Sequence, residues 1–207
     1  MLKYEKMVLG EMETNCYLVW DDESKEAVII DPADAATEIS DEIERRGLKL
    51  LVILATHGHF DHMLAAMDLK LIYNIPIAVS SLDKFLLERQ KSTAEKFLRH
   101  KVNTLDISHV DIDLNIAKNI ILGKYKMKVI KTPGHTPGGI CFHDATNQRL
   151  FTGDTLFADG SIGSTEHGYS SMLVLRRSVA QLTALPKDTL ILAGHGEENT
   201  ISNFLSS

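Results

Sequence analysis

A short polar stretch near residue 60 limits what this chain can fold into more than any other part of its sequence. It reads Thr56-His57-Gly58-His59-Phe60-Asp61-His62, and it follows the apolar run of residues 50–55. A continuous apolar run of this length is typical of a strand that is covered on both faces. Four side chains of the kind that bind metal ions therefore follow directly after a buried strand.

The spacing inside this stretch suits two metal ions side by side. Strand side chains alternate, so His57 and His59 point the same way and both imidazoles can reach one ion. A turn into a helix then directs Asp61 and His62 elsewhere, which suits a second ion ~3.5–4 Å from the first. The alternative is a polar surface loop in which histidines cluster by chance. Four ligand-type residues in six positions argue against it.

Three later segments offer further ligands. Each places one His or Asp beside Gly, Pro or Thr residues, at positions 132–138, 152–155 and 194–196. Taken singly, a His after Pro-Gly is more often a loop residue, and an Asp after Thr-Gly more often forms a turn. Together with the first stretch, they complete two coordination spheres from His57, His59, Asp61, His62, His135, Asp154 and His195.

Hydrophobic periodicity predicts strands and helices in two similar halves. In the first half we expect a hairpin over 17–30, helices over 34–46, 61–67 and 81–100, and strands over 50–55 and 75–79. In the second half we expect strands over 120–122, 127–130, 139–143, 149–152 and 189–193, and a helix over 171–185. In both halves, apolar strands end where His and Asp begin.

Length and composition indicate one globular domain over residues 1–207, because 207 residues with 44% hydrophobic side chains can build a single packed core. The net charge of −6 argues against a nucleic-acid partner. No signal-peptide core or membrane-spanning run is evident, so we expect a cytoplasmic protein that acts on a small molecule. Cys16 and Cys141 are expected to be buried free thiols.

In this order, the four ligand segments resemble the metallo-β-lactamase superfamily, specifically its glyoxalase II-like (hydroxyacylglutathione hydrolase-like) branch. Three further segments are similar to that branch: Asn15-Cys16-Tyr17, Ile30-Asp31-Pro32 and Gly153-Asp154-Thr155-Leu156-Phe157. The resemblance implies an α/β fold, a four-layer αββα sandwich of two mixed sheets flanked by helices.

The resemblance also implies ligand roles. One metal ion would take His57, His59 and His135, the second would take Asp61, His62 and His195, and Asp154 would bridge them. Imidazoles and carboxylates suit two zinc ions, and iron or manganese is compatible with the same ligands.

The implied activity is metal-dependent hydrolysis of a thioester, such as S-lactoylglutathione, or of a related ester. Two cations that share a water lower its pKa towards neutrality, so the nucleophile would be a metal-bridging hydroxide. Asp61 and Asp154 are the expected catalytic carboxylates, with Asp61 orienting the nucleophile or accepting its proton.

The residues that would contact substrate depart from the branch's pattern. Ser164 stands where an arginine is usual, and the loss of a guanidinium removes a bidentate anchor for a carboxylate. Arg176 and Arg177 could replace it, although adjacent arginines on a helix more often form a solvated face. Because the loop over 160–166 should lie beside the metals, we expect Ser164, His167 and Tyr169 to line the substrate pocket.

Two other functions use the same residues. A mono-iron persulfide (sulfur) dioxygenase on this fold would bind its metal with His57, His135 and Asp154. A non-enzymatic metal-binding scaffold is the least favoured, because scaffold versions usually lose ligands and all seven are present here.

Overall fold

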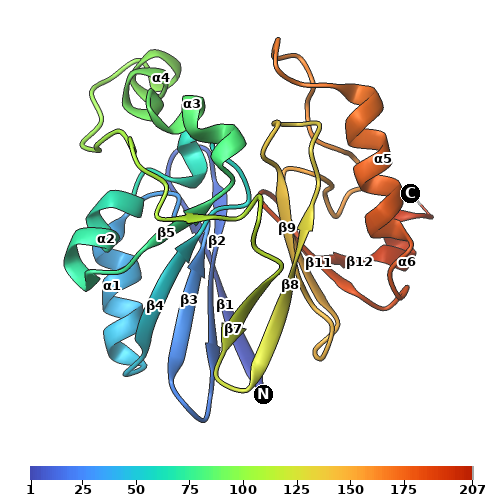
Figure 1. The fold of residues 1–207 in the computed structure, drawn as a ribbon, viewed down its shortest axis with the longest axis horizontal. Coiled ribbons are helices and arrows are strands. Elements are labelled where there is room, and N and C mark those ends of the chain that lie inside the picture. Colours follow the sequence, from blue (N-terminus) through green and yellow to red (C-terminus); the bar gives the residue numbers. More distant parts are fainter. Residues whose placement is uncertain (207) are drawn as a thin grey trace.

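The computed structural model describes residues 1–206 and contains two six-stranded sheets packed face to face, with helices on their outer faces (Figure 1). The first sheet has the order β1 (Leu2–Leu9), β2 (Thr14–Asp21), β3 (Glu26–Ile30), β4 (Lys49–Leu54), β5 (Ile77–Val79), β6 (Ile112–Asp113). The second has the order β12 (Asn199–Thr200), β11 (Leu190–Ala193), β10 (Arg149–Gly153), β9 (Ile140–Asp144), β8 (Tyr125–Lys131), β7 (Asn119–Leu122). The helices are α1 (Ala36–Arg45), α2 (Ala66–Tyr73), α3 (Lys84–Leu87), α4 (Gln90–Leu98), α5 (Met172–Thr183) and α6 (Ile201–Phe204).

Alternation of side chains along the strands creates the layers. In β3, Val28 and Ile30 join the core between the two sheets, whereas Ala27 and Ile29 face the core beneath α1 and α2. Both faces of this strand are thus buried, as expected for a strand that lies inside a sandwich. The second sheet is covered in the same way on its outer face by α5 and α6.

Both sheets are mixed. β3, β4, β5 and β6 run parallel, as do β10 and β11, and the remaining pairs are antiparallel. The predicted α/β sandwich of two mixed sheets flanked by helices is confirmed. Cys16 and Cys141 are buried free thiols, as predicted.

Two of the predicted helices were wrong. Residues 61–67 form a 3-10 turn (Phe60–His62) followed by the start of α2, and residues 81–100 divide into a 3-10 turn (Ser81–Asp83), α3 and α4. Distant residues cause the second break. The buried Gln90 side chain donates to the carbonyl of Leu105, and the Asp106 carboxylate accepts from the N–H of Lys91 at the start of α4.

Residues 2–9, for which the sequence pattern predicted no strand, form β1. No helix among residues 1–206 is long and apolar enough to cross a membrane.

The stability of the fold should depend on the core between the sheets. Phe151 is 1% exposed there and meets the Tyr17 ring edge-on, with centroids 5.2 Å apart. We expect Phe151→Ala to lower the free energy of unfolding by ~3–5 kcal/mol, because it leaves a cavity between the sheets. Ile121, which is 62% exposed, is the control. Ile121→Ala should change the free energy of unfolding by less than ~0.5 kcal/mol. Urea denaturation measures both, and equal effects would contradict this account of the core.

Candidate metal centre

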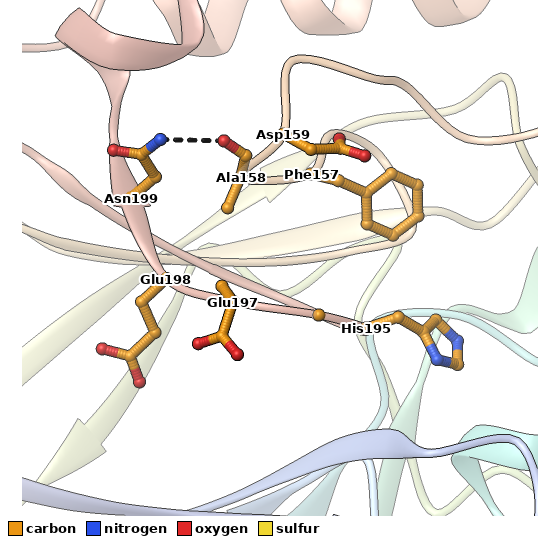
Figure 2. Close-up of a pocket in the computed structure, with 8 residues that line it drawn as sticks. Phe157, Ala158, Asp159, His195, Glu197, Glu198 and Asn199 are labelled. Atoms are coloured by element: carbon orange, nitrogen blue, oxygen red, sulfur yellow. Dashed lines mark hydrogen bonds between the residues drawn. The ribbon is translucent and has the colours of Figure 1, made fainter.

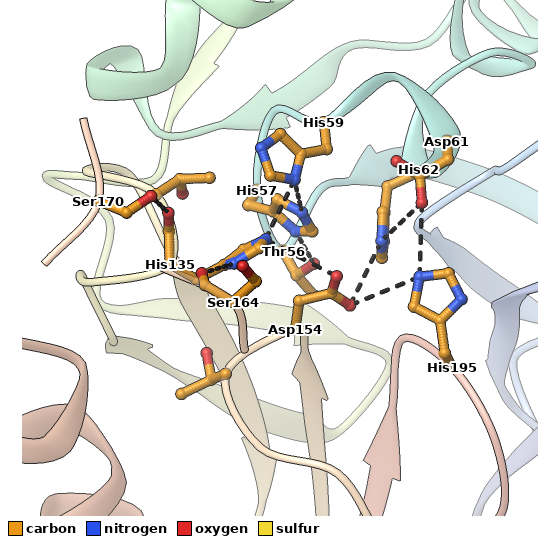
Figure 3. A network of polar contacts seen from close by, with 12 residues as sticks. Thr56, His57, His59, Asp61, His62, His135, Asp154, Ser164, Ser170 and His195 are labelled. Atoms are coloured by element: carbon orange, nitrogen blue, oxygen red, sulfur yellow. Dashed lines mark hydrogen bonds and ion pairs between the residues drawn. The ribbon is translucent and has the colours of Figure 1, made fainter. Parts of the chain in front are cut away.

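The predicted ligands come together where several strands of the two sheets end (Figure 3). β4 leads into His57 and His59, and the following 3-10 turn carries Asp61 and His62. His135 lies between β8 and β9, while β10 and β11 lead into Asp154 and His195. Candidate ligand atoms of all seven residues fall into three overlapping groups, in each of which they lie within 4.8 Å of one another: His57, His59 and His135; His57, His62 and Asp154; and Asp61, His62 and His195.

The first cluster consists of His57, His59 and His135. The Nδ1 atom of His59 lies 3.0 Å from the Nε2 atom of His57 and 3.0 Å from the Nε2 atom of His135. Three imidazole nitrogens that converge at such distances match the arrangement of histidines around one metal ion.

The second cluster consists of Asp61, His62 and His195. The Oδ2 atom of Asp61 lies 3.5 Å from the Nε2 atom of His62 and 3.4 Å from the Nε2 atom of His195. Asp154 stands between the two clusters: its Oδ1 is 3.5 Å from His62 Nε2, and its Oδ2 is 3.7 Å from His135 Nε2. Each oxygen of one carboxylate thus faces a different cluster.

Hydrogen bonds on the far side of the rings determine which nitrogens are free. The Nδ1 atoms of His62 and His135 lie 2.9 Å and 2.8 Å from Asp31 Oδ2 and the carbonyl oxygen of Ser164, respectively. Because these oxygens only accept, both Nδ1 atoms must donate. In the neutral imidazoles, this leaves the Nε2 lone pairs directed into the clusters.

The same reasoning applies to His57. Its Nδ1 lies 3.1 Å from Thr56 Oγ1, and that hydroxyl donates its own proton to Asp31 Oδ2 at 2.6 Å. Thr56 must therefore accept from His57 Nδ1, which frees His57 Nε2 for a metal ion.

Two buried atoms in the site have no hydrogen-bond partner within residues 1–206: His62 Nε2 and Asp154 Oδ1. Unpaired polar atoms are costly in a protein interior, and a bound metal ion would satisfy both of them. The chemistry of the seven side chains and these two atoms therefore fits a site for two divalent cations.

The protonation of the clustered histidines also supports a metal site. Burial and the neighbouring histidines lower the pKa of His57 well below its usual value, and burial with His135 lowers the pKa of His59 to about 3. Burial also disfavours a charged His62, but Asp61, Asp154 and Asp31 outweigh it and raise the pKa of this imidazole well above the usual value. A metal ion at His62 Nε2 would therefore replace a proton.

Two glycines allow the backbone to approach this closely. A Cβ at Gly194 would lie 2.4 Å from Asp154 Oδ1, and one at Gly58 would lie 2.9 Å from the Asp83 Cβ. The buried Asp83 carboxylate accepts from the N–H groups of Gly58 and Gly138 and from the hydroxyl of Thr136. It thereby joins the loop of His57 and His59 to the loop of His135.

A cavity of about 560 Å³ opens onto both clusters. His167 and Tyr169, two of the predicted substrate residues, line it, and their rings stack with centroids 5.0 Å apart. Ser164 is exposed and does not line the cavity; its carbonyl holds His135 instead, so a contact between Ser164 and substrate stays a prediction. Arg176 and Arg177 are exposed on α5 and do not line it either.

His195 also lines a second cavity of about 420 Å³ (Figure 2). Its other walls come from residues 157–159 and 196–199, and Asn199 donates to the carbonyl of Ala158 across it. None of these other residues belongs to the metal clusters, so the chemistry of the site lies in the first cavity.

The sequence did not predict which residues support the ligands, although Tyr169 was predicted to line the substrate pocket. Asp31, Thr56 and Tyr169 each contact the far side of a ligand imidazole, and Asp83 joins two ligand loops. Arg89 and Lys96 were not predicted as site residues either. Lys96 belongs to α4, Arg89 directly precedes that helix, and both line the cavity. The signal in the sequence was their spacing. Residues 89, 92, 93 and 96 recur at intervals that place Arg89, Ser92, Thr93 and Lys96 on one side of a helix.

Known proteins are similar to this chain in sequence and in structure. The family model described as the metallo-beta-lactamase superfamily matches residues 9–195. A hydroxyacylglutathione hydrolase, GloC, of Haemophilus influenzae is 39% identical over 203 residues, which cover 97% of this chain and 93% of GloC.

Two solved structures are also similar. The B3 metallo-beta-lactamase BLEG-1 superposes with a TM-score of 0.90 at 30% identity, over 99% of this chain and 97% of its own. TTHA1623 in a di-iron-bound form superposes with a TM-score of 0.84 at 30% identity, over 96% of each chain.

The tautomer of His62 should depend on Asp31. In Asp31→Asn, an amide NH₂ directed at His62 would favour the tautomer with its proton on Nε2, where the metal ion should bind. We expect metal affinity to fall ~10–100-fold in a competition titration with a chromogenic chelator. Asp113 also accepts from the backbone and hydroxyl of one residue, Ser81, but it is half-buried and lies outside the metal clusters. Asp113→Asn should bind metal normally, and unchanged affinity in Asp31→Asn would refute this role.

Tyr169 should position His59. Its hydroxyl lies 2.9 Å from His59 Nε2, the nitrogen that faces away from the first cluster. Tyr169→Phe removes this partner, and we expect metal affinity to fall ~10-fold in the same titration, with little change in melting temperature. Tyr125→Phe, in the hairpin between β7 and β8, is the matched control and should behave as the unmodified protein does.

Proposed function

Because the chain belongs to the metallo-beta-lactamase superfamily of metal-dependent hydrolases, we propose that it is a dinuclear, glyoxalase II-like hydrolase that cleaves a thioester or a related ester. His57, His59 and His135 would hold one metal ion, and Asp61, His62 and His195 the other, with Asp154 between them. The observation that carries the proposal is the position of Asp154, whose two oxygens face two separate ligand clusters.

Bound metal ions would supply a water of lowered pKa and positive charge for the substrate's carbonyl oxygen. The chain's own residues would do the rest. Asp61 lines the cavity and is held by the Thr14 hydroxyl, 3.3 Å from its Oδ2, so its carboxylate can orient the attacking water and accept a proton. The ring partners Asp31, Thr56 and Ser164 keep the ligand imidazoles in one tautomer throughout.

The proposed substrate class depends on the similarity between this chain and a named hydrolase. The relative GloC is named a hydroxyacylglutathione hydrolase, which supports a thioester. Zinc suits the imidazole and carboxylate ligands, while the di-iron form of TTHA1623 supports iron as the alternative metal. The proposal includes a small-molecule substrate and a cytoplasmic location, since two buried free thiols suit a reducing compartment.

The test combines metal analysis with a substrate panel. After loading with zinc, iron or manganese, we expect two ions per chain and hydrolysis of thioesters above that of lactones or phosphodiesters. His59→Ala should lower kcat/KM at least ~100-fold by removing a ligand, whereas His109→Ala, at an exposed position outside the cavity, should leave it unchanged.

Three results would overturn the proposal. Oxygen uptake with glutathione persulfide by a one-iron protein, without thioester hydrolysis, would identify a dioxygenase. Tight metal binding without turnover of any substrate would identify a scaffold. Unchanged hydrolysis in His59→Ala would remove the metal clusters from the reaction.

A further inference from the structure

The side of α4 that faces the cavity carries a defined chemical pattern. Arg89, Ser92, Thr93 and Lys96 all line the cavity, at spacings of three, four and seven residues. Such spacings place side chains on one face of a helix. The two cations and the Thr93 hydroxyl therefore offer hydrogen-bond donors on this side of the cavity, while the Ser92 hydroxyl donates to the carbonyl of Arg89. We call these four residues the α4 donor row.

The α4 donor row has no anionic partner of its own within residues 1–206. Neither Arg89 nor Lys96 takes part in an ion pair there, although the chain carries a net charge of −6. Among residues 1–206, the carboxylates that line the same cavity are Asp61 and Asp154, which belong to the metal clusters. An anion that enters the cavity thus meets two cations that form no ion pair within residues 1–206, because the neighbouring Glu95 pairs with Lys101.

Aromatic rings connect the α4 donor row with the metal centre. The Arg89 guanidinium lies 5.3 Å from the centre of the Phe85 ring, and that ring meets Tyr169 edge-on at 5.3 Å. The Tyr169 hydroxyl in turn contacts His59. Along these contacts, the rings of Phe85 and Tyr169 lie between Arg89 and the ligand His59. Phe60 and Phe97, with centroids 5.7 Å apart, add apolar surface to the cavity.

We propose that the α4 donor row binds an anionic group, a carboxylate or a phosphate, on the thiol part of the substrate. This inference rests on the proposed function, with the cleaved carbonyl at the metal centre. Because the contacts from Arg89 to His59 run through the rings of Phe85 and Tyr169, we assign the anion to the thiol and not to a small acyl group at the metal centre. Arg89 and Lys96 are then specificity-determining residues, supplied by a helix that holds no metal ligand.

The test uses three thioesters with the same acyl group. N-acetylcysteamine is an uncharged thiol, glutathione carries carboxylates, and phosphopantetheine carries a phosphate. The metal-loaded protein should have a higher kcat/KM for at least one anionic thioester than for the neutral one, and the preferred thiol identifies the anion.

The double variant Arg89→Gln/Lys96→Gln should lower kcat/KM for the preferred anionic thioester ~10-fold or more, mainly through KM, because charge-assisted hydrogen bonds are lost. The neutral thioester should be unaffected. Lys91→Gln, on α4 but outside the cavity, is the matched control and should not change the preference.

Binding of an unreactive S-alkyl thioether of each thiol, measured by calorimetry, separates this inference from the proposed function. Weaker binding of the anionic thioether in the double variant supports it even if no thioester is hydrolysed. Equal binding in both proteins, a wild-type protein without preference for either anion, or an equal loss with the neutral thioester would overturn it.

Discussion

The whole centre depends on the buried carboxylate of Asp31. It accepts from the backbone and hydroxyl of Thr56 and from the Nδ1 of His62, so it acts on His57 through Thr56 and on His62 directly. One acceptor thereby sets the free nitrogen of one imidazole in each cluster. Asp31 also adopts a positive φ of 52° directly after β3, and its N–H donates to Leu54 at the end of β4. The carboxylate is thus held by the first sheet itself.

The two sheets contribute different parts of the centre. The first sheet delivers His57, His59, Asp61 and His62 after β4, while the second delivers His135, Asp154 and His195. A complete site therefore requires the two sheets to pack in one relative position. Two interactions hold the sheets in that position. The core between the sheets buries apolar side chains, and the Asp83 carboxylate accepts buried hydrogen bonds from both His loops.

Local patterns predicted most of the strands and all seven residues that the structure gathers, and the resemblance to the superfamily implied the layered fold. Strand ends and ligand spacing are readable within a few residues. The break between α3 and α4 could not be predicted in this way, because it depends on Leu105 and Asp106 from a later segment. Tyr169 was expected near substrate, yet its contact with His59 spans 110 positions along the chain. Nothing within a local window could show that pairing.

The proposed metal ligands and the proposed anion-binding residues lie on different elements of this chain. The ligands follow strands that are fixed between two cores, whereas the cavity wall comes from α4 and the loop around His167 and Tyr169. The polar side chains of α4 that line the cavity form no hydrogen bond to a ligand, whereas Phe97 packs the helix against Phe60 in the turn that carries Asp61 and His62. The serine at position 164 fits this separation. Its backbone carbonyl accepts from His135, so this contact does not depend on the side chain at position 164. An arginine at this position could anchor a carboxylate and a serine cannot, whereas Arg89 and Lys96 place cations in the wall of the cavity.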